Sequence, residues 1–288
     1  MTKRAAYHGG NWYASDSNKL GQQLSGWLGE TKSIKKNTKA LIVPHAGYDY
    51  SGRAASRGYI NLSDTTFKRI FVLGPSHHVY TKSCGLSKHT HLETPVGDLK
   101  VDVEITNKLN LTGQFTWMTK EIDEEEHSLE MHFPYIAQVT KGRDITIVPV
   151  LVGNVPKENL KTYADIFAPY LDDPDNFFII SSDFCHWGSR FDYSPHDPSC
   201  GAIHQFIEKM DKNGMKAIES GDPSVFADYL KETKNTICGR NPISLFLWII
   251  HSSKLKFEIQ SLYYEQSSKC NSMRDSSVSY GVISFNQL

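Results

Sequence analysis

Four short apolar runs dominate the hydrophobic pattern of this chain. They lie at residues 40–43, 70–73, 145–152 and 177–180, and each is apolar nearly throughout. Such runs are typical of strands that are buried on both faces, as in a mainly parallel sheet. Between them, apolar residues recur with helical spacing at Leu20, Leu24, Trp27 and Leu28, and again from Leu160 to Leu171. The pattern predicts a three-layer α/β fold, in which helices flank a central, mixed and mainly parallel sheet.

The C-terminal quarter predicts one more helix and two more strands. Residues 243–250 form an apolar stretch, and Asn241 and Pro242 before it suggest a helix with Asn241 as the N-cap. Residues 257–264 and 277–285 alternate enough to be antiparallel strands at the edge of the sheet. Because no repeat or low-complexity linker interrupts the chain, we expect a single domain over residues 1–288.

Composition excludes several classes of protein. The chain has 31 Lys+Arg and 32 Asp+Glu, which argues against a nucleic-acid binder because phosphate binding needs a basic surface. The N-terminus lacks the apolar core of a signal peptide, and the longest apolar stretch is too short to cross a membrane. The five cysteines form no C-x-x-C pair. We therefore expect a cytoplasmic protein with reduced thiols and no membrane insertion, with the nucleus as a further expected location.

Three of the four apolar runs are followed by histidine. His45 follows the first run in PHAGY, His77 and His78 follow the second in GPSHH, and His186 follows the last in SSDFCHWG. The carboxyl ends of parallel strands meet at one edge of a sheet, where ligand sites form. Because successive extended residues point in opposite directions, only one of His77 and His78 can enter the same pocket, and spacing does not decide which.

A fourth histidine segment follows an acidic run and contains His127, Glu130 and His132. We expect the acidic run to be a solvated face or the start of a helix. The segment misses H-E-x-x-H because residue 128 is Ser128, and it misses H-x-x-E-H because residue 131 is Met131. A metalloprotease is therefore not expected. We expect these three residues to pack in the core or to support metal ligands from behind.

Cys238 precedes the predicted C-terminal helix and lies close to Arg240, surroundings that favour a lowered thiol pKa. One interpretation is a Cys–His hydrolase with Cys238 as the nucleophile. Another is a mononuclear metal site with two imidazoles and a third ligand. A carboxylate as third ligand would suit iron, whereas Cys238 would favour copper or zinc and still allow iron. The chain has no G-x-S-x-G elbow and no phosphate-binding glycine loop. The metal site fits the pattern best.

Eight motifs together resemble the Memo family, which is named for its role in ErbB2-driven cell motility. They are GGNWYA (9–14), LIVPHAGYDYSG (41–52), FVLGPSHH (71–78), EHSLEMHFPY (126–135), IVPVLVG (147–153), SSDFCHWG (181–188), TICGRNPI (236–243) and SSVSYG (276–281). The resemblance covers nearly the whole chain. It implies a fold shared with class III extradiol dioxygenases, with a central sheet flanked by helices.

The resemblance also implies roles for individual residues. His45 and His77 match two metal-binding histidines, and Cys238 matches the third ligand. His186 matches the histidine that acts as acid and base in the dioxygenases, and Asp183 is a polar group beside it. Because Cys238 stands where ring-cleaving dioxygenases carry a glutamate, we do not expect classical ring cleavage.

Two functions follow from the resemblance. The first is a redox-type protein that binds copper or iron and is linked to cell motility, signalling and metal homeostasis. The second is a non-enzymatic module that binds phosphotyrosine-containing or other anionic peptides in a pocket inherited from a dioxygenase. Trp12 matches an aromatic residue at the pocket rim, in a region that the family uses for such peptides. In the second function, Trp12 and His186 would contact the peptide.

Overall fold

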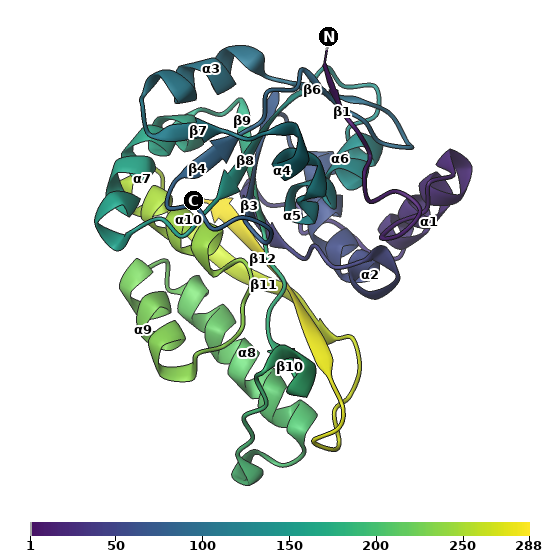
Figure 1. The fold of residues 1–288 in the computed structure, drawn as a ribbon, viewed down its shortest axis with the longest axis vertical. Helices are drawn as coiled ribbons and strands as arrows, with labels where there is room; N and C mark the ends of the chain where they lie inside the picture. Colours follow the sequence, from purple (N-terminus) through teal and green to yellow (C-terminus); the bar gives the residue numbers. More distant parts are fainter. Residues whose placement is uncertain (1) are drawn as a thin grey trace.

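The computed structural model describes residues 2–288 and places one large sheet between two layers of helices (Figure 1). The strands are β1 (Lys3–Arg4), β2 (Thr38–Val43), β3 (Arg69–Pro75), β4 (Cys84–Leu86), β5 (His91–Leu92), β6 (Leu99–Val101), β7 (Phe115–Trp117), β8 (Thr146–Val152), β9 (Asn176–Ser181), β10 (His186–Trp187), β11 (Phe257–Gln266) and β12 (Ser277–Gln287). The main path of the sheet is β1-β5-β6-β8-β3-β9-β2-β12-β10, and β11 pairs with β12. The central strands β8, β3, β9 and β2 are parallel, and β12 is antiparallel to β2. The predicted mixed, mainly parallel sheet is confirmed.

Helices cover both faces of this sheet. On one face lie α1 (Ser17–Gly29), α2 (Tyr48–Tyr59) and α6 (Phe133–Val139), and on the other lie α3 (Val103–Leu111), α7 (Lys157–Asp172) and α10 (Arg240–Ser252). Two further helices, α8 (Ile203–Glu219) and α9 (Pro223–Thr233), pack together beside β11 and α10. The short helices are α4 (Lys120–Glu125), α5 (His127–Glu130), η1 (Ile60–Asp64), η2 (Ser189–Phe191) and η3 (Pro198–Cys200). No helix in the described part of the chain is long and apolar enough to cross a membrane.

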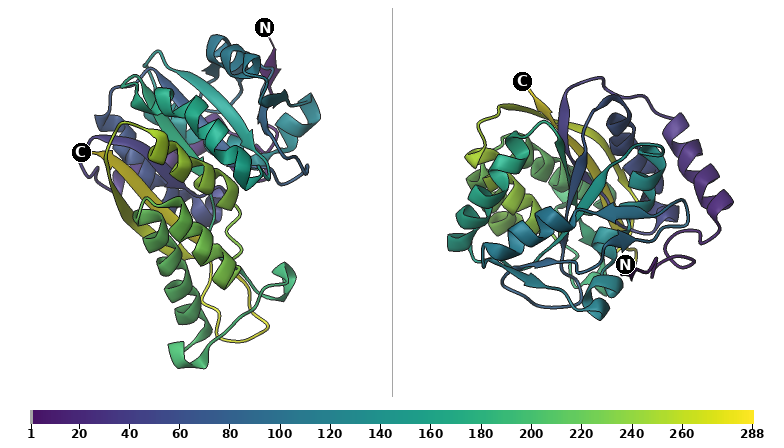
Figure 2. Two further views of the ribbon diagram at one scale, coloured as in Figure 1. Left: turned by 90° about the vertical axis from the view of Figure 1, so that its left-hand side faces the viewer. Right: turned by 90° about the horizontal axis from the view of Figure 1, so that it is seen from above.

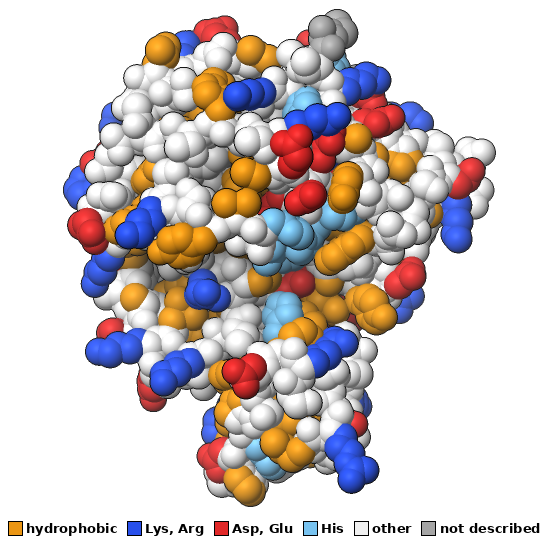
Figure 3. Space-filling view, viewed as in Figure 1, with side chains coloured by type: hydrophobic (Ala, Val, Ile, Leu, Met, Phe, Trp, Pro, Cys, Tyr) orange, Lys and Arg blue, Asp and Glu red, His pale blue; other side chains and the backbone are white. Residues whose placement is uncertain are grey.

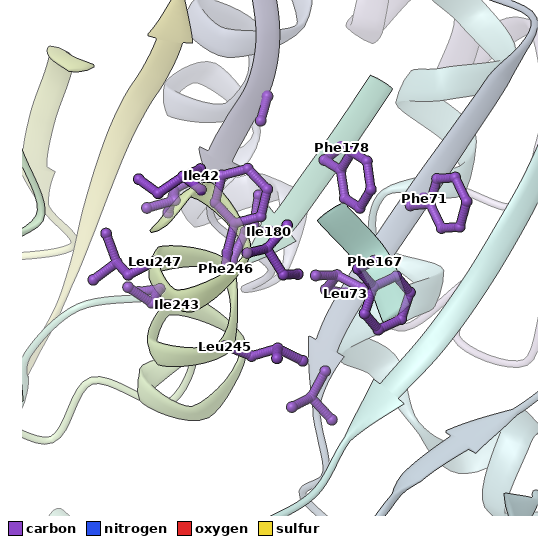
Figure 4. Packing of buried hydrophobic residues seen from close by; sticks show 14 of the residues in the cluster. Ile42, Phe71, Leu73, Phe167, Phe178, Ile180, Ile243, Leu245, Phe246 and Leu247 are labelled. Atoms are coloured by element: carbon purple, nitrogen blue, oxygen red, sulfur yellow. The ribbon is translucent and has the colours of Figure 1, made fainter. Parts of the chain in front are cut away.

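The apolar runs are continuous because both faces of the central strands are covered. In β2, Ala40 and Ile42 face the core beneath α7 and α10, whereas Leu41 and Val43 face the core beneath α1 and α2. Figure 4 shows Ile42 and its neighbours on β3 and β9 packed against side chains of α7 and α10. Burying one such aliphatic or aromatic side chain stabilises the fold by about 1.5–3 kcal/mol. This core fixes the positions of the strand ends.

The C-terminal elements differ from the sequence prediction in two details. Helix α10 begins at Arg240 with Gly239 as its N-cap, so Asn241 is inside the first turn and is not the cap. Pro242 is tolerated there because the first N–H groups of a helix have no partner within the helix. Strand β12 lies between β2 and β11, so the prediction that it is an edge strand was wrong. Strand β12 continues the sheet because helices cover both of its faces. Val282 packs in the core beneath α2, and Ile283 and Phe285 pack in the core beneath α10.

One part of the molecule extends away from the central sheet. Figure 2 shows the green helix α8 running alongside the yellow strands β11 and β12, and Figure 1 labels the short β10 near them. Strand β10 pairs with the beginning of β12. This extension carries the loops that follow β9 and the turn that joins β11 to β12. Residues of both segments line one cavity together with His45 and His77, at the carboxyl edge of the sheet.

Candidate metal centre

The carboxyl ends of β2, β3 and β9 bring predicted site residues together. His45 follows β2, His77 follows β3, and Asp183 follows β9. The ring centroids of His45 and His77 are 5.2 Å apart. Cys238 comes from the loop between α9 and α10, and its Sγ lies 3.1 Å from Nε2 of His45. Residues that are far apart in the sequence therefore surround one point at the edge of the sheet.

Gly239 allows the Cys238 loop to approach β9 closely. Its backbone N–H donates to Oγ of Ser182 at 3.1 Å. A Cβ atom at this position would collide with the carbonyl oxygen of Ser181 and with the side chain of Ser182. A residue without a side chain is therefore needed beside Cys238 for the thiol to reach His45.

His45 is buried and held by two polar contacts. Its backbone N–H donates to Oδ1 of Asp183 at 2.9 Å, and its Nδ1 lies 2.6 Å from Oγ of Ser181. The Ser181 hydroxyl already donates its hydrogen to the carbonyl of Ser128. Nδ1 of His45 must therefore be the donor, so that Nε2 keeps a free lone pair facing Cys238. Burial lowers the pKa of His45 well below its usual range, and His77 adds to this effect.

His77 is fixed by a single buried carboxylate. Glu126 accepts the backbone N–H of His77 at 2.7 Å and its Nδ1–H at 2.8 Å. Burial disfavours the charged form of Glu126, but the hydrogen bonds that His77 donates oppose this effect, and the pKa is lowered to about 2. The carboxylate thus sets the tautomer of His77 and leaves its Nε2 available, as Ser181 does for His45.

Cys238 differs from the sequence prediction in its pKa. Burial raises the pKa of its thiol well above the usual range, and the charge of Asp183 adds to the shift. The charge of Arg240 lowers the pKa as predicted, but its effect is smaller. The backbone N–H of Asp183 donates to Sγ at 3.2 Å. The thiol is therefore protonated at neutral pH, and a metal ion would have to displace its proton.

Asp183 and His186 lie on the segment that follows β9. Oδ1 of Asp183 accepts the backbone N–H groups of His45 and Ala46, and burial raises the pKa of this carboxyl. Nδ1 of His186 donates to the carbonyl of Phe184 at 3.0 Å, because a carbonyl can only accept. His186 therefore has the same free nitrogen, Nε2, as His45 and His77. Both residues line the cavity described below.

The segment 123–132 contributes more than the sequence predicted. His127 lines the cavity, and its ring stacks on those of Trp12 and His77 with centroids 4.4 Å away in both cases. Glu130 is fully buried and accepts hydrogen bonds from Arg4 and Tyr13. This buried ion pair lies behind the site.

His132 and two carboxylates of the acidic run, Asp123 and Glu126, are buried. Nδ1 of His132 lies 2.6 Å from the hydroxyl of Tyr59, and burial lowers the pKa of His132 to about 3. The expectation of a solvated face is therefore wrong for these two carboxylates, whereas the alternative, the start of a helix, is confirmed for Glu126, which caps α5. Arg4 pairs with Asp123, and His77 bonds to Glu126. These buried partners explain why the two carboxylates lie inside the protein.

A cavity of about 690 Å³ opens onto the histidines. Figure 3 shows a cluster of histidine side chains in a hollow near the middle of one face of the molecule. Trp12, Tyr50 and Arg190 line the cavity together with serines of the β11–β12 turn and its ends. A smaller cavity of about 340 Å³ reaches Cys238 and Arg240, and both cavities share His77, His186 and Phe191. His78 is exposed and lines neither of these two cavities, so His77 is the member of the pair that enters the pocket.

Two groups of donor atoms could hold a metal ion within residues 2–288. The ligand atoms of His45, His77 and His127 lie within 4.8 Å of one another, and so do those of His45, Asp183 and Cys238. The two groups share His45. The set expected from the resemblance, His45 with His77 and Cys238, therefore takes members from both groups. It remains a prediction.

Sequence reasoning missed the residues that support the ligands. Ser181 and Glu126 each bond to Nδ1 of a site histidine, and Arg4 pairs with carboxylates behind the site. Position in a motif could have pointed to Ser181 and Glu126, because they are the first residues of SSDFCHWG and EHSLEMHFPY. Arg4 has no such signal, because its partners lie more than a hundred residues away in the sequence.

The fold and the site define a three-layer α/β protein with a histidine-rich pocket, reached by one cysteine, at the carboxyl edge of its sheet. The family described as "Memo-like protein" matches residues 4–284. The chain is 45% identical over 282 residues to Protein MEMO1 of Homo sapiens, covering 96% of this chain and 95% of that protein. It is also 45% identical to the Protein memo-1 homolog of Caenorhabditis elegans, covering 96% of this chain and 81% of that protein. The chain therefore belongs to the Memo family.

Among solved structures, an uncharacterized protein from Escherichia coli K12 aligns with 84% of this chain and 99% of its own. The TM-score is 0.48 and the sequence identity is 12%. This likeness is weaker than that to the curated relatives, and it assigns no function to the site.

Proposed function

We propose that this protein binds copper or iron through His45, His77 and Cys238 and takes part in redox chemistry or metal handling. The observation that supports this most is the 3.1 Å separation of the Cys238 thiol from Nε2 of His45. Thiolate and imidazole are ligands that copper accepts readily and iron also accepts. In this proposal, the metal ion is the cofactor of the protein.

The donor set fits such a metal. Ser181 and Glu126 occupy Nδ1 of His45 and His77, so each imidazole keeps Nε2 for coordination. The partly buried thiol can lose its proton when it binds the metal, because a metal ion lowers the thiol pKa. When bound, copper or iron supplies one-electron exchange with small oxidants such as dioxygen or superoxide.

The remaining residues would manage protons and access. His186 keeps Nε2 free, because its Nδ1 donates to Phe184, and it lines both cavities. It can therefore accept or donate a proton beside the metal. Asp183 holds the backbone of His45 in place through its Oδ1. The cavity of about 690 Å³ is large enough to admit a small substrate.

A second candidate is the binding of phosphotyrosine-containing or other anionic peptides without turnover. The observation that favours it is the lining of the main cavity, where Trp12, Arg190 and His186 face the same space as Ser267, Ser268 and Ser276. Arginine and hydroxyl groups recognise phosphate, and an indole can stack on a phenyl ring. This function would not need a metal ion.

Metal analysis of the purified protein and three variants tests these alternatives. We expect copper or iron in stoichiometric amount in the unmodified protein, and its loss in His45→Ala, His77→Ala and Cys238→Ser. The exposed His78→Ala serves as the control and should keep the metal. Metal-free protein that still binds a phosphotyrosine peptide would overturn the proposal and favour the second candidate. Hydrolysis that needs Cys238 but survives chelation would instead indicate a Cys–His hydrolase.

A further inference from the structure

His127 has no role in the proposed three-residue centre, although it lies inside the same pocket. We propose that His127 is an additional metal ligand, which joins His45 and His77 in an all-imidazole set for a divalent ion such as Cu²⁺. The proposed centre of His45, His77 and Cys238 then holds the softer monovalent ion Cu⁺. The inference rests on the proposed function, because it concerns how the same centre accepts two kinds of ion.

The first support is the position of the His127 ring. It lies between the rings of Trp12 and His77, stacked on each with centroids 4.4 Å away. Its ring centroid also lies 5.4 Å from that of His45, in an edge-to-face arrangement. The donor atoms of the three imidazoles lie within 4.8 Å of one another. The imidazole is therefore held beside the two histidines that the metal proposal already uses.

The second support is the hydrogen bonding of the neighbouring histidines. Nε2 of His8 bonds to the carbonyl of Glu125, and Nδ1 of His132 bonds to Tyr59. Within residues 2–288, neither ring nitrogen of His127 has a hydrogen-bond partner, and the carboxylate of Glu126 is 3.7 Å from its Nδ1. The ring nevertheless lines the cavity and its side chain is only 14% exposed. A largely buried imidazole with both nitrogens free is suited to bind an ion.

The third support is the link between His127 and His77. Glu126 immediately precedes His127 and accepts two hydrogen bonds from His77. The same carboxylate also caps α5 by accepting the N–H of Ser128 at 2.9 Å. The carboxylate of Glu126 thus holds the backbone at His77 and at Ser128, the residue that directly follows His127. The distance between the His77 and His127 rings is therefore set by these buried hydrogen bonds of Glu126.

Ligand chemistry assigns an ion to each donor group. Imidazole nitrogens are borderline ligands that suit Cu²⁺, whereas a thiolate favours the softer Cu⁺. His45 belongs to both groups. An ion at this site can therefore keep His45 and His77 while its third ligand is either His127 or Cys238.

The test uses the full chain in metal-free form, with Cu²⁺ alone and Cu⁺ alone as probes. Each ion is titrated against a competing chelator, Cu⁺ under anaerobic conditions, for the unmodified protein, His127→Ala and His127→Gln. We expect the affinity for Cu²⁺ to fall at least about tenfold in both variants. The affinity for Cu⁺ should stay unchanged. The electron paramagnetic resonance spectrum of the Cu²⁺ form should lose the hyperfine coupling of one nitrogen.

His78→Ala is the matched control, because its ring lies 6.2 Å from that of His127 and outside both donor groups. It should leave both affinities and the spectrum unchanged. An unchanged Cu²⁺ affinity and nitrogen coupling in the His127 variants would overturn the inference. So would an equal fall in both affinities, because that indicates a structural role for His127. Failure of the unmodified protein to bind either copper ion would also overturn the inference, and failure to bind iron as well would overturn the proposed function itself.

Discussion

The carboxylate of Glu126 holds His77 by two hydrogen bonds, from the backbone N–H at 2.7 Å and from Nδ1 at 2.8 Å. This contact sets both the direction of the ring and the nitrogen that remains available. An ionised carboxylate can accept both bonds, whereas a neutral amide has a single oxygen acceptor. The proposed metal site therefore depends on a residue that would not itself touch the metal.

Replacement of Glu126 by glutamine should weaken metal binding without removing a ligand. We expect the affinity for copper or iron to fall by about 10–100-fold in Glu126→Gln. Competition with a chelator measures this affinity. Glu125→Gln is the matched control, because Glu125 is the exposed neighbour in the sequence. Equal affinities in both variants would mean that Glu126 does not position His77.

Gly239 should be intolerant of any side chain. In Gly239→Ala, the new methyl group would collide with Ser181 and Ser182, and the loop would move Cys238 away from His45. We expect weaker metal binding and a loss of about 1–3 kcal/mol in the free energy of unfolding. Gly26→Ala is the control, because a Cβ there has no atom within 4 Å. A metal affinity in Gly239→Ala equal to that of the unmodified protein would contradict the view that Gly239 lets Cys238 approach His45.

The sequence predicted those features that depend on local pattern. The runs at 40–43, 70–73 and 177–180 became central strands because both faces of each are covered. Their carboxyl ends then brought His45 and His77 to one edge, as the spacing indicated. The start of α10 was misplaced because Asn241 and Pro242 are also acceptable inside a first turn.

The features that sequence reasoning missed depend on long-range contacts. The lowered pKa predicted for Cys238 was wrong, because burial at the contact with β9 outweighs the charge of Arg240. Glu126 belonged to an acidic run that resembles a solvated surface, yet His77 makes it a buried partner. Arg4 could not be found, because its carboxylate partners become neighbours only in the folded chain.

Arg4 should contribute strongly to stability. Its guanidinium contacts Asp123 at 3.0 Å and also pairs with Glu130, and all three side chains are buried. Removing one partner of a buried ion pair leaves uncompensated charge, so Arg4→Ala should cost about 3–5 kcal/mol of unfolding free energy. Urea unfolding measures this loss. The neighbouring Lys3→Ala, whose pair with Asp98 is exposed, should leave the free energy nearly unchanged.

If Arg4→Ala loses no more unfolding free energy than Lys3→Ala, the buried ion pairs of Arg4 do not stabilise the fold as predicted. The comparison is informative because both residues belong to β1 and pair with acidic side chains. They differ in burial and in partners, because Arg4 bonds to Asp123, Glu130 and backbone carbonyls, whereas Lys3 pairs with Asp98. The expected contrast therefore isolates the effect of removing a charge from a buried network.

His132 should make the protein less stable in acid. Burial lowers its native pKa to about 3, whereas the unfolded chain binds this proton below about pH 6.5. Between these values the unfolded state binds more protons, so stability falls as the pH falls through this window. The contribution of one such group is at most about 1.4 kcal/mol per pH unit.

Comparison of urea unfolding at about pH 7 and about pH 5 tests this effect. In His132→Phe the group no longer titrates, so the variant should lose less stability on acidification than the unmodified protein. The Tyr59 hydrogen bond is also lost in this variant, but that loss lowers stability at both pH values. An identical pH dependence in the two proteins would contradict the lowered pKa of His132.

The central claim is that His45 and Cys238 bind the same metal ion. X-ray absorption at the copper edge of the reduced Cu⁺ form, or at the iron edge where the purified protein retains iron, tests it most directly. The account predicts one sulfur neighbour of the metal together with imidazole nitrogens, and loss of the sulfur signal in Cys238→Ser. A spectrum with only nitrogen and oxygen neighbours, unchanged in Cys238→Ser, would contradict the account.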